Sequence, residues 1–309
     1  MTNPFFEPST LPYGLPPFAD ITDEHYRPAF EAGLAHHLAE IAAITGSSDS
    51  PTFENTIVAL ERGGQILDRV ATVFFNKSSA DSTDFTNALE EEIAPLLAAH
   101  SDAIRLDASL YSRISDLHSR RADLGLTDED VYLIERYYTE FTQSGAGLSP
   151  DDKTTLREFN QRLSVLTTRF EKNLLADTND LAVVVDDVAE LDGLGQGEIS
   201  ATAQAAADRG LDGKYLLTLV LPTGHPFLAA LTNRSLRERL MTASRSRGIR
   251  GGDNDNRELV LEITRLRAAR AKLLGFESHA AFVTSDQTAG TPEAVDAMLR
   301  GLAPAAARN

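Results

Sequence analysis

Apolar residues recur three or four positions apart along most of the chain, which is the spacing of one buried helical face. In the segment 52–74 this series starts at Phe53 and skips a turn only around Gly63 and Gly64, so it predicts one helix that runs through both glycines. A glycine inside a helix costs about 1 kcal/mol relative to alanine. We therefore expect a neighbouring helix to approach this pair closely.

Capping residues mark the beginnings of several further helices. Thr22 precedes Asp23 and Glu24, which suit the positive end of a helix. Ser149 is followed by Pro150, and proline is favoured at the first helical position. The other predicted helices cover residues 22–44, 83–101, 107–122, 127–143, a long stretch from 149 past 174, and then 234–246, 255–275, 277–285 and 291–308.

Two runs rich in Val, Leu and Tyr have the composition of strands rather than of helices. They cover residues 181–185 and 215–221, and a short Ala-rich helix near 197–208 is expected between them. The pattern therefore predicts a mainly α protein, in which a helical bundle carries a small β-ribbon insert around 181–221.

The N-terminal segment contains too many prolines for a regular helix. Its aromatic residues suggest that it lies along an apolar surface, and they are Phe5, Phe6, Tyr13 and Phe18. The expected organisation is an extended arm over 1–21, a helical bundle over 22–180, a small α/β insert over 181–232 and a helical segment over 233–309.

Acidic residues outnumber basic ones, since the 309 residues include 29 Lys and Arg against 46 Asp and Glu, a formal net charge of −17. Residues 234–272 are the exception, with 11 basic and 5 acidic residues, net +6. We expect this basic segment to pair with the acidic remainder of the chain, and a phosphate or RNA site is the alternative. The overall balance argues against a general nucleic-acid-binding protein.

Cysteine is absent, which excludes disulfides, thiolate metal sites and a cysteine nucleophile. No run approaches the roughly 20 continuous apolar residues of a membrane span. The N-terminal segment lacks a basic region followed by an apolar core, so it does not resemble a secretory signal. The cytoplasm is the expected compartment.

None of the seven histidines is followed by glutamate, so the sequence lacks the helical His-Glu-x-x-His zinc motif. His36 and His37 point about 100° apart on a helix and cannot share a metal ion, and we expect both to be solvated. We expect His225 in a structural turn and His279 at a helix start. Neither a Gly-x-Ser-x-Gly elbow nor a phosphate-binding loop occurs. The residues alone therefore give no catalytic, cofactor-binding or metal-ligating candidate.

Four segments, taken in order, resemble the thimet oligopeptidase family of zinc metallopeptidases. They are TFENTIVALERGGQILDRV (52–70), LREFNQRLSVLTTRFEKNLLADT (156–178), KYLLTLVLPTGHPFLAALTNRSLRERLMTASRSRG (214–248) and DNDNRELVLEITRLRAARAKLLGFESHAAFVTSDQTAGTPEAVDAML (253–299). None of them is a catalytic motif, but the ordered set extends over nearly the whole chain. Within this family, the sequence resembles the branch that contains peptidyl-dipeptidase Dcp and oligopeptidase A. It leans toward the Dcp side at Asp286, Gln287, Ala289, Thr291 and Pro292.

The resemblance implies a mainly helical fold of two lobes that face each other across a narrow channel. In this family, two histidines of a His-Glu-x-x-His motif and a downstream glutamate hold zinc, and the motif glutamate is the general base. The resemblance also implies short peptides as substrates, with removal of C-terminal dipeptides in the Dcp branch. Because the sequence stops before the region where the zinc motif would lie, it carries no catalytic or metal residue of the family.

We therefore expect the chain to be the N-terminal, channel-wall portion of such an enzyme, with no zinc of its own and no activity by itself. Its partners would be short peptides and the missing C-terminal catalytic lobe, and neither nucleic acid nor a membrane is expected. The alternative is a non-catalytic helical module that binds peptides or another protein. An enzyme fragment should expose an apolar docking surface, whereas an interaction module should be a well-behaved monomer.

Overall fold

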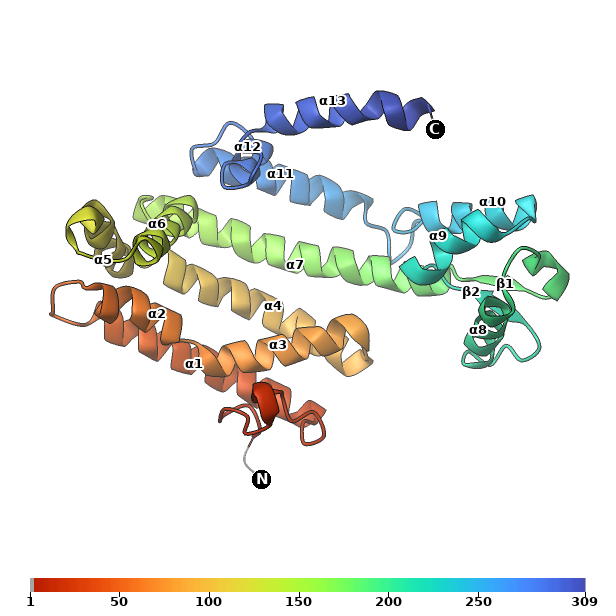
Figure 1. Ribbon diagram of the computed structural model, residues 1–309, viewed down its shortest axis with the longest axis horizontal. Helices are drawn as coiled ribbons and strands as arrows, with labels where there is room; N and C mark the ends of the chain where they lie inside the picture. The colour runs from red at the N-terminus through yellow and green to blue at the C-terminus, as the bar shows by residue number, and fades with distance from the viewer. Residues whose placement is uncertain (1–2, 309) are drawn as a thin grey trace. The chain divides into compact units, whose positions relative to one another are not determined.

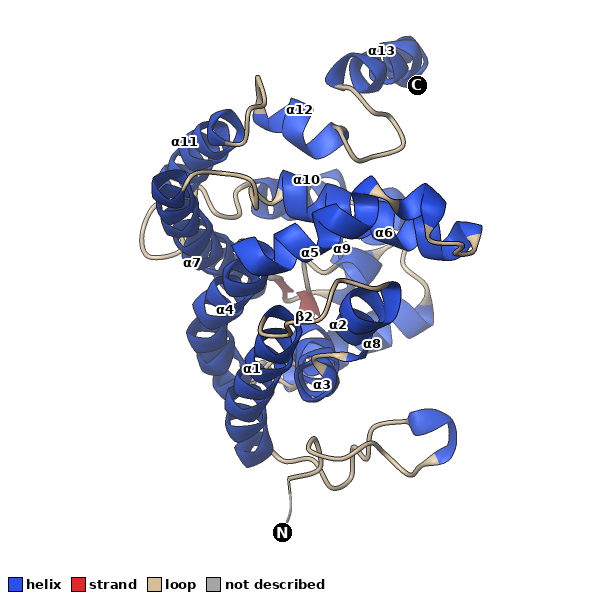
Figure 2. Cartoon of the chain, turned by 90° about the vertical axis from the view of Figure 1, so that its left-hand side faces the viewer, coloured by secondary structure: helices blue, strands red, loops and turns tan. Residues whose placement is uncertain are grey.

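Helices make up most of the computed structural model, which describes residues 3–308 (Figure 1, Figure 2). Within these residues the β-structure is one pair of short strands, so the expected mainly α fold with a small β-ribbon is confirmed. The chain divides into two compact units, one formed by Met1–Val165 with Thr264–Asn309 and the other by Leu166–Ile263. The boundaries of the four-part organisation expected from the sequence stay predictions.

The first unit is built from helices joined by short connections. Its complete helices are α1 (Asp23–Thr45), α2 (Ala59–Arg62), α3 (Gln65–Ala80), α4 (Asp84–Arg105), α5 (Ala108–Ser119), α6 (Asp128–Gln143), α12 (His279–Thr284) and α13 (Pro292–Arg308). Two further helices, α7 (Pro150–Asp180) and α11 (Arg257–Leu273), belong partly to this unit and partly to the second. One of its apolar cores contains Ile41, Ile44, Ile57, Leu60, Leu110, Ile114, Leu117, Ile134, Phe141 and Ala146.

Capping residues begin α1 and α7 where the sequence places them. The backbone N–H of Thr22 donates to Nδ1 of His25 at 3.0 Å, at the start of α1. The N–H of Asp152 donates to Oγ of Ser149 at 3.2 Å, at the start of α7. The Ser149 bond satisfies a backbone donor that every helix N-terminus leaves unpaired, and the Thr22 bond fixes the residue before α1.

The helix expected over 52–74 is interrupted at its two glycines, so the prediction of one continuous helix was wrong. After a π-helical turn (Phe53–Val58), α2 ends at Gly63, and α3 starts anew after Gly64. Gly64 has a φ of +74°, a left-handed conformation that glycine adopts without steric cost. Its N–H donates to Oε2 of Glu40 on α1 at 2.8 Å, so the expected close approach of a neighbouring helix is confirmed.

The helices α1 and α3 pack along each other (Figure 1). A Cβ atom added at Gly33 of α1 would lie 2.9 Å from both Cα and N of Leu67 on α3, closer than a side chain can come to a backbone. The absence of a side chain at this one position therefore sets the distance between the helices. A second core of the unit surrounds this contact and contains Phe5, Tyr26, Ala29, Phe30, Val70, Val73, Phe74, Leu89 and Ile93.

The N-terminal arm is buried at its beginning and exposed further on. The ring of Phe5 is 3% exposed, and its centroid lies 5.5 Å from that of Tyr26. Phe6, Tyr13 and Phe18 are exposed, and Tyr13 lies in a 3₁₀ turn at Pro12–Gly14. The expectation that the aromatic residues lie on an apolar surface is therefore confirmed for Phe5 and wrong for Phe6, Tyr13 and Phe18.

The second unit contains the two strands and the helices around them. Strand β1 (Val183–Val185) pairs antiparallel with β2 (Tyr215–Leu217), and Val184 lies opposite Leu216. The helices are α8 (Gln196–Ala207), α9 (Leu221–Ala230) and α10 (Arg234–Arg245), together with parts of α7 and α11. The core of this unit contains Val183, Val185, Leu191, Leu194, Leu217, Leu219, Phe227, Leu231, Leu236 and Leu240.

The second strand is shorter than the sequence pattern predicts. It ends at Leu217, and α9 begins at Leu221 with a proline in its first turn, a position that favours a helix start. The strand expected over 215–221 was therefore too long. His225, which we expected in a turn, lies inside α9 for the same reason.

A buried aspartate of α7 organises the basic segment in the second unit. Asp177 is 1% exposed and accepts hydrogen bonds from the N–H of Gly248 at 2.7 Å and from Nη2 of Arg250 at 2.5 Å. The Arg250 guanidinium holds the pKa of this carboxyl below its usual range. A second arginine, Arg239, pairs with Glu190 at 3.4 Å. For these two arginines the expected pairing with acidic residues is confirmed.

Replacing Gly33 by alanine should destabilise the protein, because the new Cβ would push α1 away from the backbone of Leu67. Overpacking of this kind costs about 1–3 kcal/mol, which exceeds the gain of about 1 kcal/mol from the better helix propensity of alanine. Gly197→Ala in α8 is the matched control, since a Cβ there meets no atom within 4 Å. Urea unfolding should show a lower stability for Gly33→Ala only, and equal stabilities of the two variants would contradict the prediction.

Replacing Asp177 by alanine should leave the buried N–H of Gly248 without its acceptor. An unsatisfied buried donor costs about 1–3 kcal/mol, and we expect a loss of this size in urea unfolding at pH 7. Asp255→Ala is the control, because the N–H of Gly251 that it leaves unpaired is exposed to water. The wild-type advantage should shrink as the pH falls through the lowered pKa of Asp177, since protonation removes the charge that Arg250 binds. An advantage that is independent of pH down to pH 2 would count against this account.

Candidate functional site

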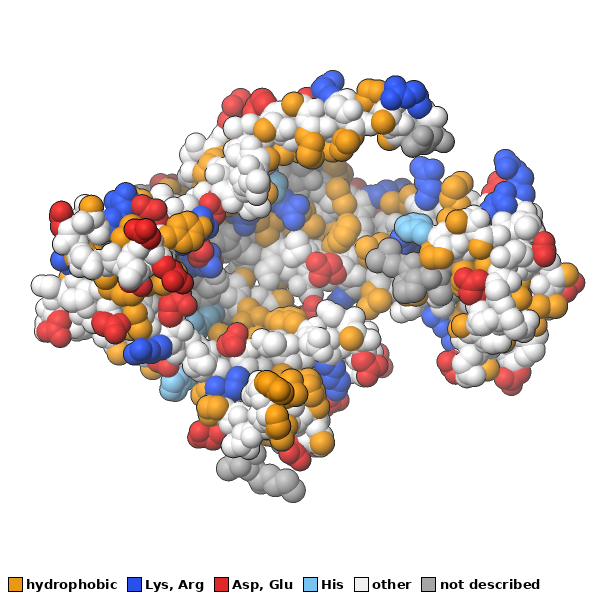
Figure 3. All heavy atoms as spheres, in the orientation of Figure 1, with side chains coloured by type: hydrophobic (Ala, Val, Ile, Leu, Met, Phe, Trp, Pro, Cys, Tyr) orange, Lys and Arg blue, Asp and Glu red, His pale blue; other side chains and the backbone are white. Residues whose placement is uncertain are grey.

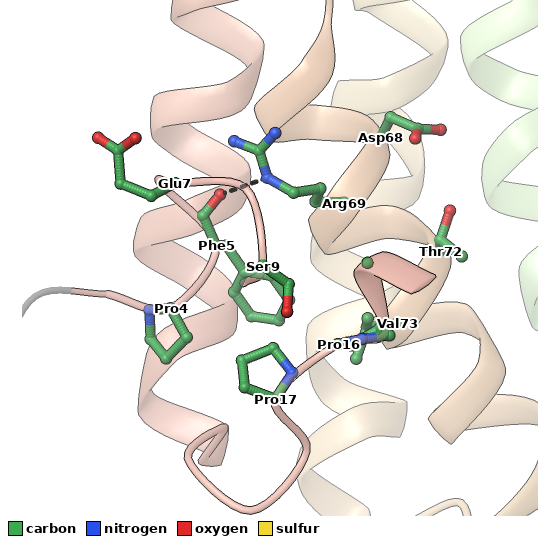
Figure 4. Close-up of a pocket in the computed structure, with 11 residues that line it drawn as sticks. Pro4, Phe5, Glu7, Ser9, Pro16, Pro17, Asp68, Arg69, Thr72 and Val73 are labelled. Carbon is green, nitrogen blue, oxygen red and sulfur yellow. Dashed lines mark hydrogen bonds between the residues drawn. The ribbon is translucent and has the colours of Figure 1, made fainter. Parts of the chain in front are cut away.

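A cavity of about 250 Å³ lies between the N-terminal arm and α3 (Figure 4). Arg69 of α3 fixes the arm there, because its Nε and Nη2 donate to the carbonyl oxygens of Phe5 and Phe6 at 2.9 and 3.0 Å. Prolines prevent the arm from closing into a helix. The apolar part of the lining consists of Pro4, Phe5, Pro16, Pro17 and Val73.

The polar groups of this cavity do not form a catalytic arrangement. Figure 4 shows the side chains of Glu7 and Asp68 on opposite sides of Arg69. The hydroxyl of Ser9 donates to the carbonyl oxygen of Leu15 at 2.6 Å, so its proton is held by a backbone group and not by a base. The cavity is suited to an apolar group rather than to bond cleavage.

The adjacent histidines of α1 have different surroundings. His36 is exposed, and its Nδ1 lies 3.3 Å from Oε1 of Glu40. His37 is half-buried, and its Nδ1 lies 3.0 Å from Nε2 of His100 on α4. The expectation of two solvated histidines is therefore confirmed for His36 and wrong for His37. The sequence does hold one signal for this contact, since His100 follows the buried Ile93 of α4 by seven residues and so shares its face.

The remaining histidines lie in separate places. His118 of α5 stacks on Tyr138, with ring centroids 3.9 Å apart, and His279 begins α12 as expected from the sequence. Among residues 3–308, no group of three or more His, Asp or Glu side chains is arranged to hold a metal ion. The zinc that the family resemblance implies has no fitting set of ligands in this part of the chain. That the chain carries no catalytic, cofactor-binding or metal residue stays a prediction.

A polar network that the sequence does not reveal connects α4, α7 and α11 in the first unit. Asn160 donates to Oδ1 of Asp102 at 2.8 Å and accepts from Nη1 of Arg270 at 3.2 Å. Burial raises the pKa of Asp102 and lowers that of Arg270, while the guanidinium of Arg270 also lies over the ring of Phe282 at 5.4 Å. The amide of Asn160 joins the two charged groups, so the network links α4, α7 and α11.

The helix α13 presents apolar side chains to solvent along its length. None of its residues is buried, and Met298, Leu299 and Leu302 are 58%, 54% and 60% exposed. Figure 3 shows hydrophobic side chains along this helix. An amphipathic helix normally buries such a face, so the apolar side chains of α13 lack a cover among the described residues.

No helix in the described part of the chain is both long and apolar enough to span a lipid bilayer.

Comparison with known proteins connects these features to peptidases. Residues 227–308 match peptidase family M3. The whole chain is similar to dipeptidyl carboxypeptidase of Escherichia coli K12, with 40% identity over 304 residues that cover 98% of this chain and 45% of that protein. Dipeptidyl carboxypeptidase of Salmonella typhimurium LT2 is 38% identical to this chain, and the match covers 99% of this chain and 45% of that protein.

Similarity to a second kind of peptidase is weaker but equally extensive. Oligopeptidase A of Escherichia coli K12 is 29% identical over 307 residues, which cover 98% of this chain and 44% of the relative. The chain thus spans less than half the length of the curated relatives it matches. The family resemblance seen in the sequence is confirmed by the match to peptidase family M3 and by the similarity of nearly the whole chain to dipeptidyl carboxypeptidase and oligopeptidase A.

Proposed function

We propose that this chain is the N-terminal, channel-wall portion of a cytoplasmic zinc metallopeptidase that removes C-terminal dipeptides from short peptides or cleaves such peptides internally. The observation that carries the proposal is the 40% identity to a dipeptidyl carboxypeptidase along 98% of the chain. The lower identity of 29% to an oligopeptidase A favours dipeptide release over internal cleavage.

In this proposal the chain supplies structure and substrate-facing surface, and another part of the enzyme supplies the chemistry. The sequence has no His-Glu-x-x-His motif, and the described residues offer no metal-binding group. Its tight helix packing around Gly33 and its buried networks are suited to a rigid wall. Peptide binding and orientation are the tasks that such a wall performs.

The alternative is a non-catalytic helical module that binds a peptide or a protein. The cavity between the arm and α3 favours this alternative, because it offers an apolar lining without a catalytic group. The exposed apolar side chains of α13 suit both functions, as a docking face either for the rest of an enzyme or for a separate partner. The two experiments below separate the proposals.

The purified 309-residue chain should not hydrolyse an internally quenched short peptide, with or without added zinc, because it lacks the motif that would hold the metal. The nucleotide sequence that follows codon 309 in the gene should encode His-Glu-x-x-His. Hydrolysis that a chelator abolishes would contradict the assignment of chemistry to another part. A gene that ends at this codon would favour the interaction module.

The purified chain should also self-associate, because the apolar face of α13 has no cover within the described residues. The double variant Leu299→Gln, Leu302→Gln should weaken association by at least tenfold, since burying one leucine contributes roughly 1.5–3 kcal/mol and 1.4 kcal/mol corresponds to tenfold. Met241→Gln, which changes an exposed apolar residue of α10, is the control and should not alter association. Sedimentation equilibrium measures the effect, and a wild-type monomer would remove the support that α13 gives to an enzyme fragment.

A further inference from the structure

Two histidines from distant parts of the sequence form a hydrogen-bonded pair inside the first unit. Nδ1 of His37 on α1 and Nε2 of His100 on α4 lie 3.0 Å apart, and the ring centroids are separated by 5.0 Å. His100 is 8% exposed. The pair is a direct polar link between these two helices, and neither the family assignment nor the proposed function gives it a role.

The pair also contacts the turn between α2 and α3. A Cβ atom added at Gly64 would lie 3.0 Å from Nδ1 of His37, so the turn backbone packs directly on the imidazole ring. The N–H of Gly64 donates to Glu40, one turn further along α1 from His37. A movement of the His37 ring therefore displaces the Gly63–Gly64 turn.

Few charges act on the two rings. On α1, Glu40 favours the protonated form of His37 and His36 opposes it, and His37 opposes the protonated form of His100 on α4. The turn residues that face His37 are Gly63 and Gly64, which carry no charge. Burial lowers the pKa of both rings, and at His37 it outweighs the effect of Glu40.

An N–H···N hydrogen bond needs one ring nitrogen with a proton and one without. A neutral pair meets this condition, because one ring donates and the other accepts. When both rings are protonated, Nδ1 of His37 and Nε2 of His100 both carry hydrogens and positive charges face each other. The other nitrogen of His100, Nδ1, is buried without a partner among the described residues, so its proton would also lack an acceptor.

We infer that the His37–His100 pair is a proton-operated latch, which holds α1, α4 and the Gly63–Gly64 turn together when neutral and releases them when both rings are protonated. The turn also borders a cavity of about 420 Å³, lined by Glu40, Arg62 and Gly63 among others. Release of the latch loosens one wall of that cavity. Protonation of His37 and His100 therefore changes the wall of this cavity.

The direction of the pH effect follows from proton binding. A histidine in an opened or unfolded segment titrates near 6.5, whereas burial keeps both latch rings below this value in the closed state. The opened state therefore binds more protons, and the closed state loses stability as the pH falls below about 6.5. Above that range both states are neutral at these rings, and the latch contributes no pH dependence.

The amide proton of Gly64 is the probe for the test, because its hydrogen bond to Glu40 breaks when the turn opens. Hydrogen exchange of the full chain, measured by NMR with EDTA present, gives the opening constant at pH 7.5 and pH 5.5. Each ring contributes up to about tenfold at pH 5.5, so the constant should rise on the order of ten- to a hundredfold. An opening constant that is the same at both pH values overturns the latch.

Glutamine variants remove the titrating groups while keeping a donor amide. In His100→Gln the amide can donate to Nδ1 of His37, and the increase on acidification should fall to about that of a single ring. In the double variant His37→Gln, His100→Gln it should fall below about twofold. His225→Gln in the second unit is the control and should behave like the wild type. A double variant that keeps the wild-type increase overturns the latch, and if it does not fold, the wild-type measurement decides alone.

Discussion

The short distance between α1 and the helices beside it is the constraint on which the first unit depends. At Gly33 only a hydrogen atom fits against the backbone of Leu67, and at Gly64 a left-handed turn brings an amide to Glu40. These two contacts fix α3 and the turn on α1, and the half-buried ring of His37 lies there beside His100. Close packing of this kind permits only small displacements, so a change at one contact is transmitted to the others.

Local sequence signals predicted most helix boundaries because capping acts over three or four residues. Ser149 begins α7 through a bond to a backbone group three residues away. The errors lie where distant residues decide the outcome. The apolar series through Gly63 is continuous enough for one helix, yet Glu40, 24 residues from Gly64, stabilises a break. Likewise, the composition of the arm does not show that Phe5 meets Tyr26 while Tyr13 remains in solvent.

The contacts between distant polar residues were harder to predict than the fold, for a related reason. The His37–His100 contact spans 63 residues, and only the position of His100 on the buried face of α4 indicated it. Asn160 contacts Asp102, which lies 58 residues before it, and Arg270, which lies 110 residues after it, and no local pattern indicates such contacts. The family resemblance could be recognised from the sequence because it rests on the order of long segments, which does not require any contact to be known.

Acid acts on the two units through different groups. In the second unit, Arg250 and the N–H of Gly248 keep Asp177 charged, and this stabilisation is complete above the ordinary pKa of aspartate, near 3.9. In the first unit, the stabilisation by the neutral histidine pair is lost at the much higher pH where a free histidine is protonated, near 6.5. Between these two values the contacts of Asp177 persist while those of His37 weaken. A mildly acidic solution therefore loosens the α2–α3 turn and leaves the anchored Gly248–Arg250 segment in place.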